Sequence, residues 1–310
     1  MTRFLLRRLG FSVLVLALVA SATFVATLKL GDPVSVLAGA HPSAEDRAHI
    51  RRFYGLDRPI YVQLATYGAH LAQGDLGRSY RFRQPVAALI VERLPRTVLL
   101  GLLALLTYTT FGIALGTVAA ARRGRRTDAA IMAGTFLAAS TPELLSGKLL
   151  LIVVAYYLGW FPIGGYGVGL VDHLRHAVLP AMTLAFGWTA YYARLTRHEV
   201  TEVMRADYMR TARAKGLSPW AALVRHALRN ALLPLVTALG VAGGALFGGA
   251  VVTEAIFAWP GVGKLAYDAT LGLDVPVIVG CVIVSTVGVL SGNLISDVVC
   301  ARLDPRLRSA

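Results

Sequence analysis

Apolar residues in this sequence gather in runs of about the length that a helix needs to cross a lipid bilayer. That length is roughly 20 residues. Six segments approach or exceed it, and they cover residues 9–28, 98–120, 129–158, 177–192, 231–257 and 275–299. The pattern predicts an all-α integral membrane protein with six transmembrane helices.

Composition supports a membrane protein and excludes several other classes. Of the 310 residues, 56% are apolar and 15% are charged, and the mean hydropathy is +0.61. Soluble domains carry about 25% charged residues. A disordered chain, a coiled coil and a typical cytosolic enzyme are therefore excluded.

Positive charge lies beside the apolar runs, although the formal net charge of +14 by itself is also typical of nucleic-acid-binding proteins. The clustered arginines are Arg3, Arg7, Arg8, Arg122, Arg123, Arg125, Arg126, Arg302, Arg306 and Arg308. Basic clusters of this kind mark the cytoplasmic ends of membrane spans. We therefore expect both termini in the cytoplasm, and we expect a multi-pass protein of the bacterial cell membrane with no nucleic-acid partner.

The order of polar and apolar segments predicts four regions. Residues 1–30 form an amino-terminal tail and the first transmembrane helix, and residues 31–95 form a small helical extracytoplasmic element rich in arginine. A five-helix core covers residues 96–300 and contains a cytoplasmic loop at 194–229, followed by a cytoplasmic tail at 301–310. A cleavable signal peptide is the alternative for the first run, but its apolar residues continue past the candidate cleavage site at 20–22.

The loop at 194–229 has the local signals of two helices that meet at a sharp corner. Residues 202–215 are rich in helix-forming side chains, and Gly216 follows as a residue that can close a helix. Ser218 and Pro219 then suit the cap and first turn of a second helix. Small residues beside the corner would let it enter a cleft on a partner protein.

The same loop resembles the "EAA" loop of ABC-importer permeases. The segment Arg210-Thr-Ala-Arg-Ala-Lys-Gly216 is similar to the form found in the dipeptide/oligopeptide/nickel branch of that family. The likeness extends through Gly-Asp-Pro at 31–33, Leu-Asp-Arg-Pro at 56–59, Gly-Asp-Leu-Gly at 74–77, Glu-Ala-Ile-Phe-Ala-Trp-Pro-Gly-Val-Gly at 254–263 and Asp-Pro-Arg at 304–306. The combination covers nearly the whole chain.

The resemblance implies a type I permease fold and a permease subunit of an ATP-driven importer for di- or oligopeptides. Its implied partners are a second homologous permease, two ATPase subunits and an extracytoplasmic substrate-binding protein. The chain would be no enzyme and would bind no cofactor, since ATP and magnesium would be held by the ATPase subunits. The implied ATPase-coupling residues are Asp207, Tyr208, Arg210, Thr211, Ala212, Arg213, Ala214, Lys215 and Gly216.

Charged and small residues inside the apolar runs indicate a translocation pathway, because ionisable groups are costly in a membrane. The candidate pathway residues are Pro142, Glu143, Lys148, Gly244, Gly248 and Glu254. Glu143 and Lys148 either meet a substrate terminus or neutralise each other. Glu254 suits an outer gate or an interfacial anchor. The glycines suit either a moving pathway helix or plain tight packing, as do Gly112 and Gly116.

Three alternatives to a peptide importer remain open. A permease for nickel or another small ligand belongs to the same branch, and His173 and His176 are spaced for one helix face, yet no full set of metal ligands is evident. An ATPase-independent secondary transporter would usually contain two matched halves, which the sequence does not display. A membrane-anchored structural protein is the third alternative. The segment 210–216 disfavours the secondary transporter most strongly.

Overall fold

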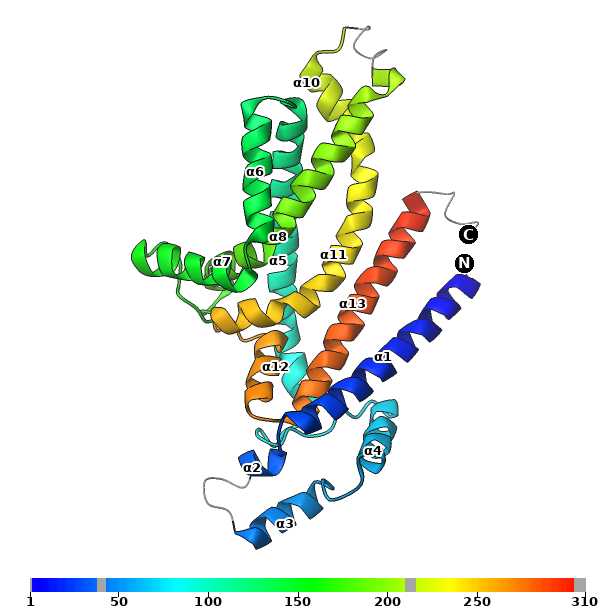
Figure 1. The fold of residues 1–310 in the computed structure, drawn as a ribbon, viewed down its shortest axis with the longest axis vertical. Coiled ribbons are helices and arrows are strands. Elements are labelled where there is room, and N and C mark those ends of the chain that lie inside the picture. The colour runs from blue at the N-terminus through cyan, green and yellow to red at the C-terminus, as the bar shows by residue number, and fades with distance from the viewer. Residues whose placement is uncertain (1, 38–42, 210–215, 304–310) are drawn as a thin grey trace. The chain divides into compact units, whose positions relative to one another are not determined.

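A computed structural model describes residues 2–37, 43–209 and 216–303 of the chain. The described residues are helical, with one isolated bridge between Arg78 and Pro85 and no strand (Figure 1). They form two compact units: one comprises residues 1–97 and 260–288, and the other comprises 98–259 and 289–310. The expected all-α class is confirmed for the described residues.

Three helices are long and apolar enough to cross a membrane. These segments lie at Gly10–Thr27, Val86–Ala121 and Val275–Ile295, and one bent pair of helices would make a fourth. The search covers only the described residues. The remaining two expected runs, at 177–192 and 231–257, lie inside the long helices α8 (Leu170–Arg205) and α11 (Arg229–Ile256) apart from Phe257.

The expected span at 129–158 is not one continuous helix, because the structure divides it into two helices. Helix α6 (Arg126–Ser140) and the segment Glu143–Tyr157 meet at an angle of 104°. Thr141 is extended, with φ −85° and ψ 121°, and Pro142 follows it. A residue before proline is driven out of the helical region by the proline ring, so the chain bends there.

The first unit contains the helical element expected after the first apolar run. Helix α1 (Thr2–Leu30) is followed by α2 (Pro33–Leu37), α3 (Ala44–Phe53) and α4 (Ile60–Ala72). Ser43 and Asp46 form a reciprocal capping box at the start of α3. After α4, the Gly77 amide and the His70 ring hydrogen-bond Asp75 and lower the pKa of its carboxyl.

The core of the first unit joins segments that are distant in the sequence. The start of α5 (Val86–Ala121) packs on α12 (Val262–Leu271) and on the first half of α13 (Val275–Leu303) through Val86, Leu265 and Val277. A second cluster packs Phe24 of α1 against Tyr67 of α4, whose rings stack at 5.4 Å. Where these helices span the membrane, van der Waals packing of such side chains holds them together, because lipid supplies no hydrophobic driving force.

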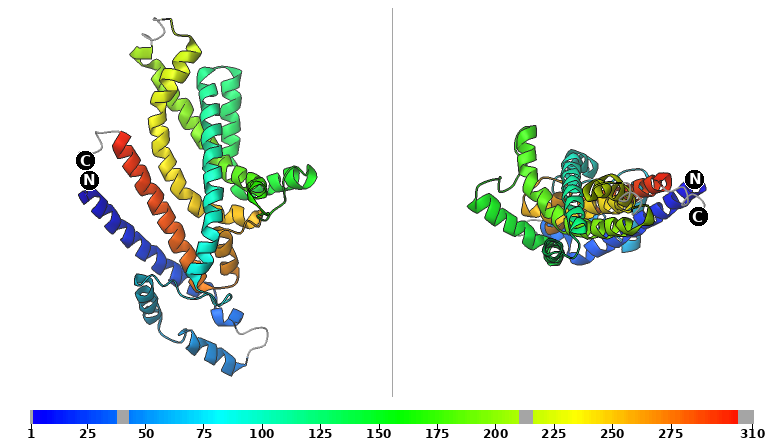
Figure 2. Two further views of the ribbon diagram at one scale, coloured as in Figure 1. Left: turned by 180° about the vertical axis from the view of Figure 1, so that it is seen from behind. Right: turned by 90° about the horizontal axis from the view of Figure 1, so that it is seen from above.

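The second unit is organised around α8. This helix contacts α6, α7 (Glu143–Leu150) and α11, and Figures 1 and 2 show it passing between α6 and α11. The π-helical segment η1 (Leu151–Tyr157) continues α7. The core of the unit contains the fully buried rings of Tyr108, Tyr192 and Trp259.

Two glycines of α5 allow close approach to α8. A Cβ atom added at Gly116 would lie 2.5 Å from the Ala193 carbonyl oxygen and 2.5 Å from the Thr196 Cβ. A Cβ at Gly112 would collide with Tyr192. For Gly112 and Gly116 the structure therefore supports tight helix packing, in which small residues let two helix backbones approach closely.

Candidate functional site

The loop between α8 and α11 begins at a break that the sequence did not predict. A continuous helix over 202–215 was expected, but α8 ends at Arg205 and Ala206 is extended, with φ −64° and ψ 148°. Met209 follows and is fully buried in a cluster with Val200, Ala222 and Leu223. The expectation was wrong at Ala206 because packing overrides the intrinsic helix preference of single residues.

The far side of the corner has the predicted geometry. Gly216 has φ +87°, a left-handed conformation that favours glycine. The Ser218 Oγ accepts a hydrogen bond from the Ala221 amide at 3.2 Å, and α10 (Pro219–Ala222) begins at the next residue. The left-handed glycine and the Ser218 cap are therefore confirmed, whereas the helix that Gly216 was expected to close would include residues 210–215, which lie outside the described residues.

The predicted coupling residues divide into described and undescribed positions. Asp207 and Tyr208 are exposed, and the Asn230 Nδ2 donates to the Tyr208 Oη at 2.8 Å, which ties the loop to α11. Gly216 is exposed. The remaining coupling residues lie outside the described residues: Arg210, Thr211, Ala212, Arg213, Ala214 and Lys215.

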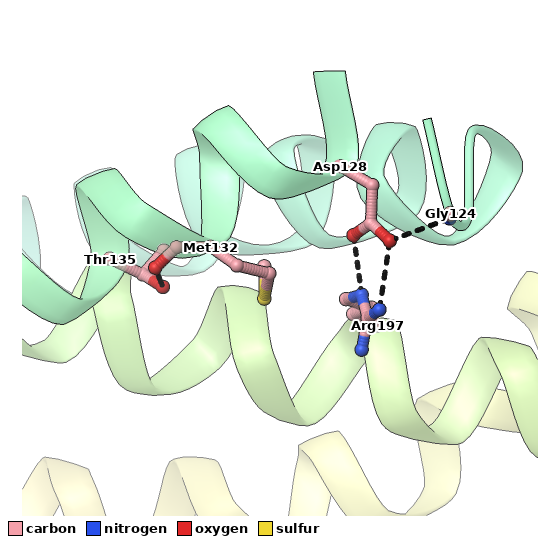
Figure 3. A network of polar contacts seen from close by, with 5 residues as sticks. All are labelled: Gly124, Asp128, Met132, Thr135 and Arg197. Carbon is pink, nitrogen blue, oxygen red and sulfur yellow. Dashed lines mark hydrogen bonds and ion pairs between the residues drawn. The ribbon is translucent and has the colours of Figure 1, made fainter. Parts of the chain in front are cut away.

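A partly buried ion pair fixes α6 to α8. The Arg197 Nε donates to the Asp128 Oδ1 at 2.6 Å, and the Arg197 Nη2 donates to the Asp128 Oδ2 at 2.9 Å (Figure 3). The Gly124 amide also donates to this carboxylate, at 2.9 Å, and Asp128 is 5% exposed. A bidentate pair of this kind defines orientation as well as distance.

The sequence alone did not predict this pair. Asp128 follows a four-arginine cluster and lies 69 positions before Arg197, so neither helical spacing nor a known motif connects the two residues. A second contact supports the same helix pair, since the Arg194 Nη1 donates to the Thr135 carbonyl at 3.2 Å. The one sequence signal that could have indicated this pair was the single acidic residue Asp128 beside a cluster of basic residues.

After the bend that follows α6, the predicted pathway residue Glu143 contacts α11 next to a second predicted pathway residue, Glu254. Pro142 precedes α7, and the Glu143 carboxylate in the first turn of α7 accepts a hydrogen bond from the Thr253 hydroxyl of α11. Glu254, the next residue of α11, is fully buried. That burial disagrees with an interfacial anchor for Glu254.

Lys148 is placed apart from Glu143. Its side chain is exposed, and no ion pair joins it to Glu143 in the described part of the chain. Mutual neutralisation, one of the two alternatives for these charges, is therefore not found among the described residues. The other two predicted pathway residues, Gly244 and Gly248, lie within α11.

Helices α7, α8 and α11 meet closely beside Glu143. A Cβ atom added at Gly147 would lie 3.0 Å from the Thr183 Cγ2 and 3.1 Å from the Ile256 Cδ1. The Phe257 carbonyl accepts a hydrogen bond from the Gly165 amide at 2.9 Å, which fixes the loop before α8 to the end of α11. The carboxylate of Glu143 thus lies at a rigid junction.

The histidines considered as metal ligands have other partners. The Nδ1 of His173 lies 2.8 Å from the Tyr166 carbonyl, and the Nδ1 of His176 lies 2.8 Å from the Asp172 carbonyl. The His173 ring also stacks on the Tyr166 ring at 3.8 Å. Among the described residues, no group of three or more potential ligands could hold a metal ion.

An apolar groove of about 710 Å³ lies between α5, α6 and α8. Its lining includes Phe111, Ile131 and Phe186, and the few polar groups are hydroxyls such as that of Thr107. The Thr107 hydroxyl already donates to the Leu103 carbonyl. The groove therefore suits an apolar occupant and not a charged one.

Comparison with known proteins places the chain among membrane transport components. Residues 112–309 match the sequence profile described as binding-protein-dependent transport system inner membrane component, and residues 1–101 match the corresponding amino-terminal profile. An oligopeptide transport system permease protein of Bacillus subtilis and a di/tripeptide transport system permease protein of Pseudomonas aeruginosa are each 37% identical to the chain. A glutathione transport system permease protein of Salmonella choleraesuis is also 37% identical. Each alignment covers 99% of both chains.

Proposed function

The chain belongs to the family of binding-protein-dependent transport system inner membrane components, and from this membership we propose that it moves peptides across a bacterial membrane. It is a permease subunit of a peptide-type ABC importer. The observation that carries this conclusion is the similarity, over 99% of both chains, to permeases whose names specify peptide or glutathione transport. Glutathione is itself a tripeptide, so the named substrates form one chemical class.

The proposed assembly contains this chain, a second homologous permease, two ATPase subunits and an extracytoplasmic binding protein. The family depends on a binding protein, and its transport is driven by ATPase partners. In this proposal, the chain crosses the membrane six times, has both termini in the cytoplasm and has an extracytoplasmic element at 31–95. ATP and magnesium belong to the ATPase subunits in this proposal, and this chain contributes no catalytic residue.

The loop between α8 and α11 is the proposed contact with an ATPase subunit. Its described residues support this role because the Met209 cluster holds the chain before the undescribed segment, and the Gly216 turn and the Ser218 cap define the chain after it. A loop that is held on both sides transmits displacement instead of absorbing it. Closure of an ATP-bound ATPase pair would move two such loops together and shift the helices that continue from them.

The junction at Glu143 is the proposed contact with the translocation pathway. A carboxylate close to the bend of a membrane segment is costly and is therefore a candidate for function. Its position beside Thr253 and Glu254 supports a shared polar region between α7 and α11. We propose that Pro142 sets the bend and that Glu143 is available to a substrate ammonium group when these helices separate.

Substitution of Gly216 tests the coupling function. Gly216→Val forces a β-branched residue into φ +87°, which distorts the corner, and we expect ATP-driven peptide uptake by the reconstituted importer to fall at least about tenfold. Gly159→Val is the matched control, because Gly159 has φ +64° and open space around its Cα hydrogens, as Gly216 does. The control should retain uptake.

Membrane assembly of both variants is measured by co-purification with the ATPase subunits and by thermal stability. Gly216→Val should remain folded, because only the loop is distorted. Unchanged uptake in Gly216→Val, or uptake by the unmodified chain without any ATPase subunit, would contradict the proposed function.

A further inference from the structure

The apolar groove between α5, α6 and α8 extends over about the depth of one bilayer leaflet. Leu103 and Leu115 line it at positions 12 residues apart on α5, which is about 18 Å along a helix. One leaflet supplies half of the hydrocarbon core, or about 15 Å. Two of the groove's hydroxyls, those of Thr107 and Thr135, each donate to a carbonyl of their own helix. The groove therefore fits an extended apolar chain about as long as one leaflet is deep.

Arginines continue two rows of groove-lining residues at one end of the groove. The row on α8 has a spacing of four residues and consists of Met182, Phe186 and Ala190, with Arg194 next. Residues four apart are neighbours on one face of a helix. On α5, Arg122 follows the lining residue Leu115 by seven positions, which is about two helical turns. Both arginines are exposed, so they lie at the mouth of the groove beside the loop between α5 and α6.

Neutral acceptors hold these two arginines in place. The Arg194 Nη1 donates to the carbonyl of Thr135, which lines the groove, at 3.2 Å. The Arg122 Nη1 donates to the Thr127 hydroxyl at 3.3 Å. A guanidinium has five N–H donors, and neither group is paired with a carboxylate in the described part of the chain. Each can therefore bind an anion without giving up an ion pair.

The loop beside this mouth adds positive charge and little negative charge. Its other exposed arginines are Arg123, Arg125 and Arg126. Asp128 is the one acidic residue between positions 93 and 142, and its carboxylate is already bound by Arg197. Basic pockets between transmembrane helices on the cytoplasmic side bind anionic lipid headgroups. The charge at the mouth thus complements a phosphate group.

The opposite end of the groove favours an anion less. Arg175 is exposed beside the lining residue Leu174, but Asp172 lies three positions before it on the same side of α8. A carboxylate at that spacing offsets part of the positive charge. An anionic group is therefore better accommodated at the end with Arg122 and Arg194.

We propose that the groove binds one acyl chain of an anionic phospholipid from the cytoplasmic leaflet, with the lipid phosphate held by Arg122 and Arg194. This site goes beyond the proposed function and takes from it only the cytoplasmic position of the loop between α5 and α6. The apolar tail and the anionic headgroup of one molecule match the two parts of the site. A transmembrane helix of a partner protein could fill the apolar part, but nothing would then neutralise the two guanidinium groups.

Fluorescence quenching by brominated lipids tests the site in the assembled importer. In a background of Cys281→Ser and Cys300→Ser, Met182→Cys takes a fluorophore in the groove, and Phe136→Cys takes one on α6 outside it. The native side chains are 43% and 71% exposed, so both positions can be labelled. In nanodiscs, brominated phosphatidylglycerol should bind at position 182 at least about fivefold more tightly than brominated phosphatidylcholine, because one surface arginine contributes about that preference. The two lipids should quench equally at position 136.

Charge variants identify the groups that select the anionic lipid. In Arg122→Gln/Arg194→Gln the preference at position 182 should fall at least about fivefold, whereas Arg122→Lys/Arg194→Lys keeps both charges and should keep most of the preference. Arg175→Gln is the matched control, because it removes an exposed arginine from the other end of the same groove. Its preference should be unchanged. Thermal stability and co-purification with the ATPase subunits measure folding and assembly of each variant.

Each other result would overturn the inference. An unchanged preference in the assembled glutamine pair, or equal quenching by the two lipids at position 182, would exclude a site for an anionic lipid. Quenching at position 182 in the isolated chain but not in the importer would show that a helix of the second permease fills the groove. A loss in Arg175→Gln alone would place the headgroup at the other end. Lipid binding is measured without transport, so an importer that shows the expected quenching but takes up no peptide would contradict the proposed function alone.

Discussion

Single side chains determine how this chain makes polar contacts within a largely apolar protein. Glu143 illustrates how far the sequence alone could lead, because a carboxylate within an apolar run is visible without a structure. The sequence suggested Lys148 as its neighbour, whereas the structure pairs it with Thr253, 110 positions later. Spacing predicts neighbours on one helix, but it contains no information on contacts between helices that are distant in the sequence.

The ion pair of Asp128 and Arg197 leads to a prediction about stability. Asp128→Ala leaves the Arg197 guanidinium, whose side chain is 30% exposed, without the carboxylate that it donates to twice, and we expect the free energy of unfolding to fall by about 2 kcal/mol. The measurement is denaturant unfolding of the detergent-solubilised chain, followed by fluorescence of its four tryptophans.

Glu202→Ala is the matched control for that measurement. It removes an exposed pair in which the Arg205 Nη1 lies 3.4 Å from the Glu202 Oε1, and such pairs contribute less than about 1 kcal/mol. Replacing both partners of the buried pair with apolar residues, in Asp128→Leu/Arg197→Met, should recover part of the lost stability. Equal losses in Asp128→Ala and Glu202→Ala would contradict the structural role of the buried pair.

Helix ends were predicted correctly where local sequence signals define them. They were predicted poorly where packing against other helices defines them. Gly216, Ser218 and Pro219 act through their own backbone and side chains, so the corner before α10 could be predicted. The end of α8 at Ala206 could not be predicted, because it depends on the burial of Met209 among residues of other helices. The bend at Pro142 had a local cause, but an apolar run that continued on both sides of it obscured the bend.

Close packing of α5 on α8 gives a prediction at the scale of elements. Gly116→Val places side-chain atoms against the backbone of α8, which can yield only if the two helices separate. We expect the melting temperature of the solubilised chain to fall by about 5 °C, as overpacked positions lose about 1 to 3 kcal/mol. Differential scanning fluorimetry of the full chain measures the change.

Gly187→Val tests whether the effect arises from contact or from the loss of glycine alone. Gly187 lies within α8 and has no heavy atom within 4 Å of an added Cβ, so valine there meets open space. Its melting temperature should stay within about 1 °C of the unmodified chain, since helix propensity changes little on replacing glycine with valine. Similar decreases in both variants would exclude close packing as the cause.

The family and function of the whole molecule could be predicted from its sequence. The path of the chain through the membrane could be predicted only in part. Short motifs spread from residues 31–33 to 304–306 identified the transport family that the comparisons confirm. Counting apolar runs gave six spans, whereas three helices and one bent pair satisfy the criteria of length and composition among the described residues. Helices α8 and α11 combine apolar stretches with charged or undescribed portions, so hydropathy alone does not define their membrane limits.

Labelling with a thiol reagent that cannot cross membranes tests the proposed path of the chain. In a background with Cys281 and Cys300 replaced by serine, Tyr61→Cys reports on the element at 31–95 and Trp220→Cys reports on the loop before α11. Both native side chains are well exposed, at 74% and 60%, so a cysteine at either position should react wherever the reagent has access. In spheroplasts, Tyr61→Cys should be labelled and Trp220→Cys should not, and inverted vesicles should give the opposite pattern, because the basic clusters beside the spans predict opposite sides for the two segments. Labelling of both positions from the same side would reject the six-span topology, while full labelling of both after detergent treatment establishes that each cysteine is reactive.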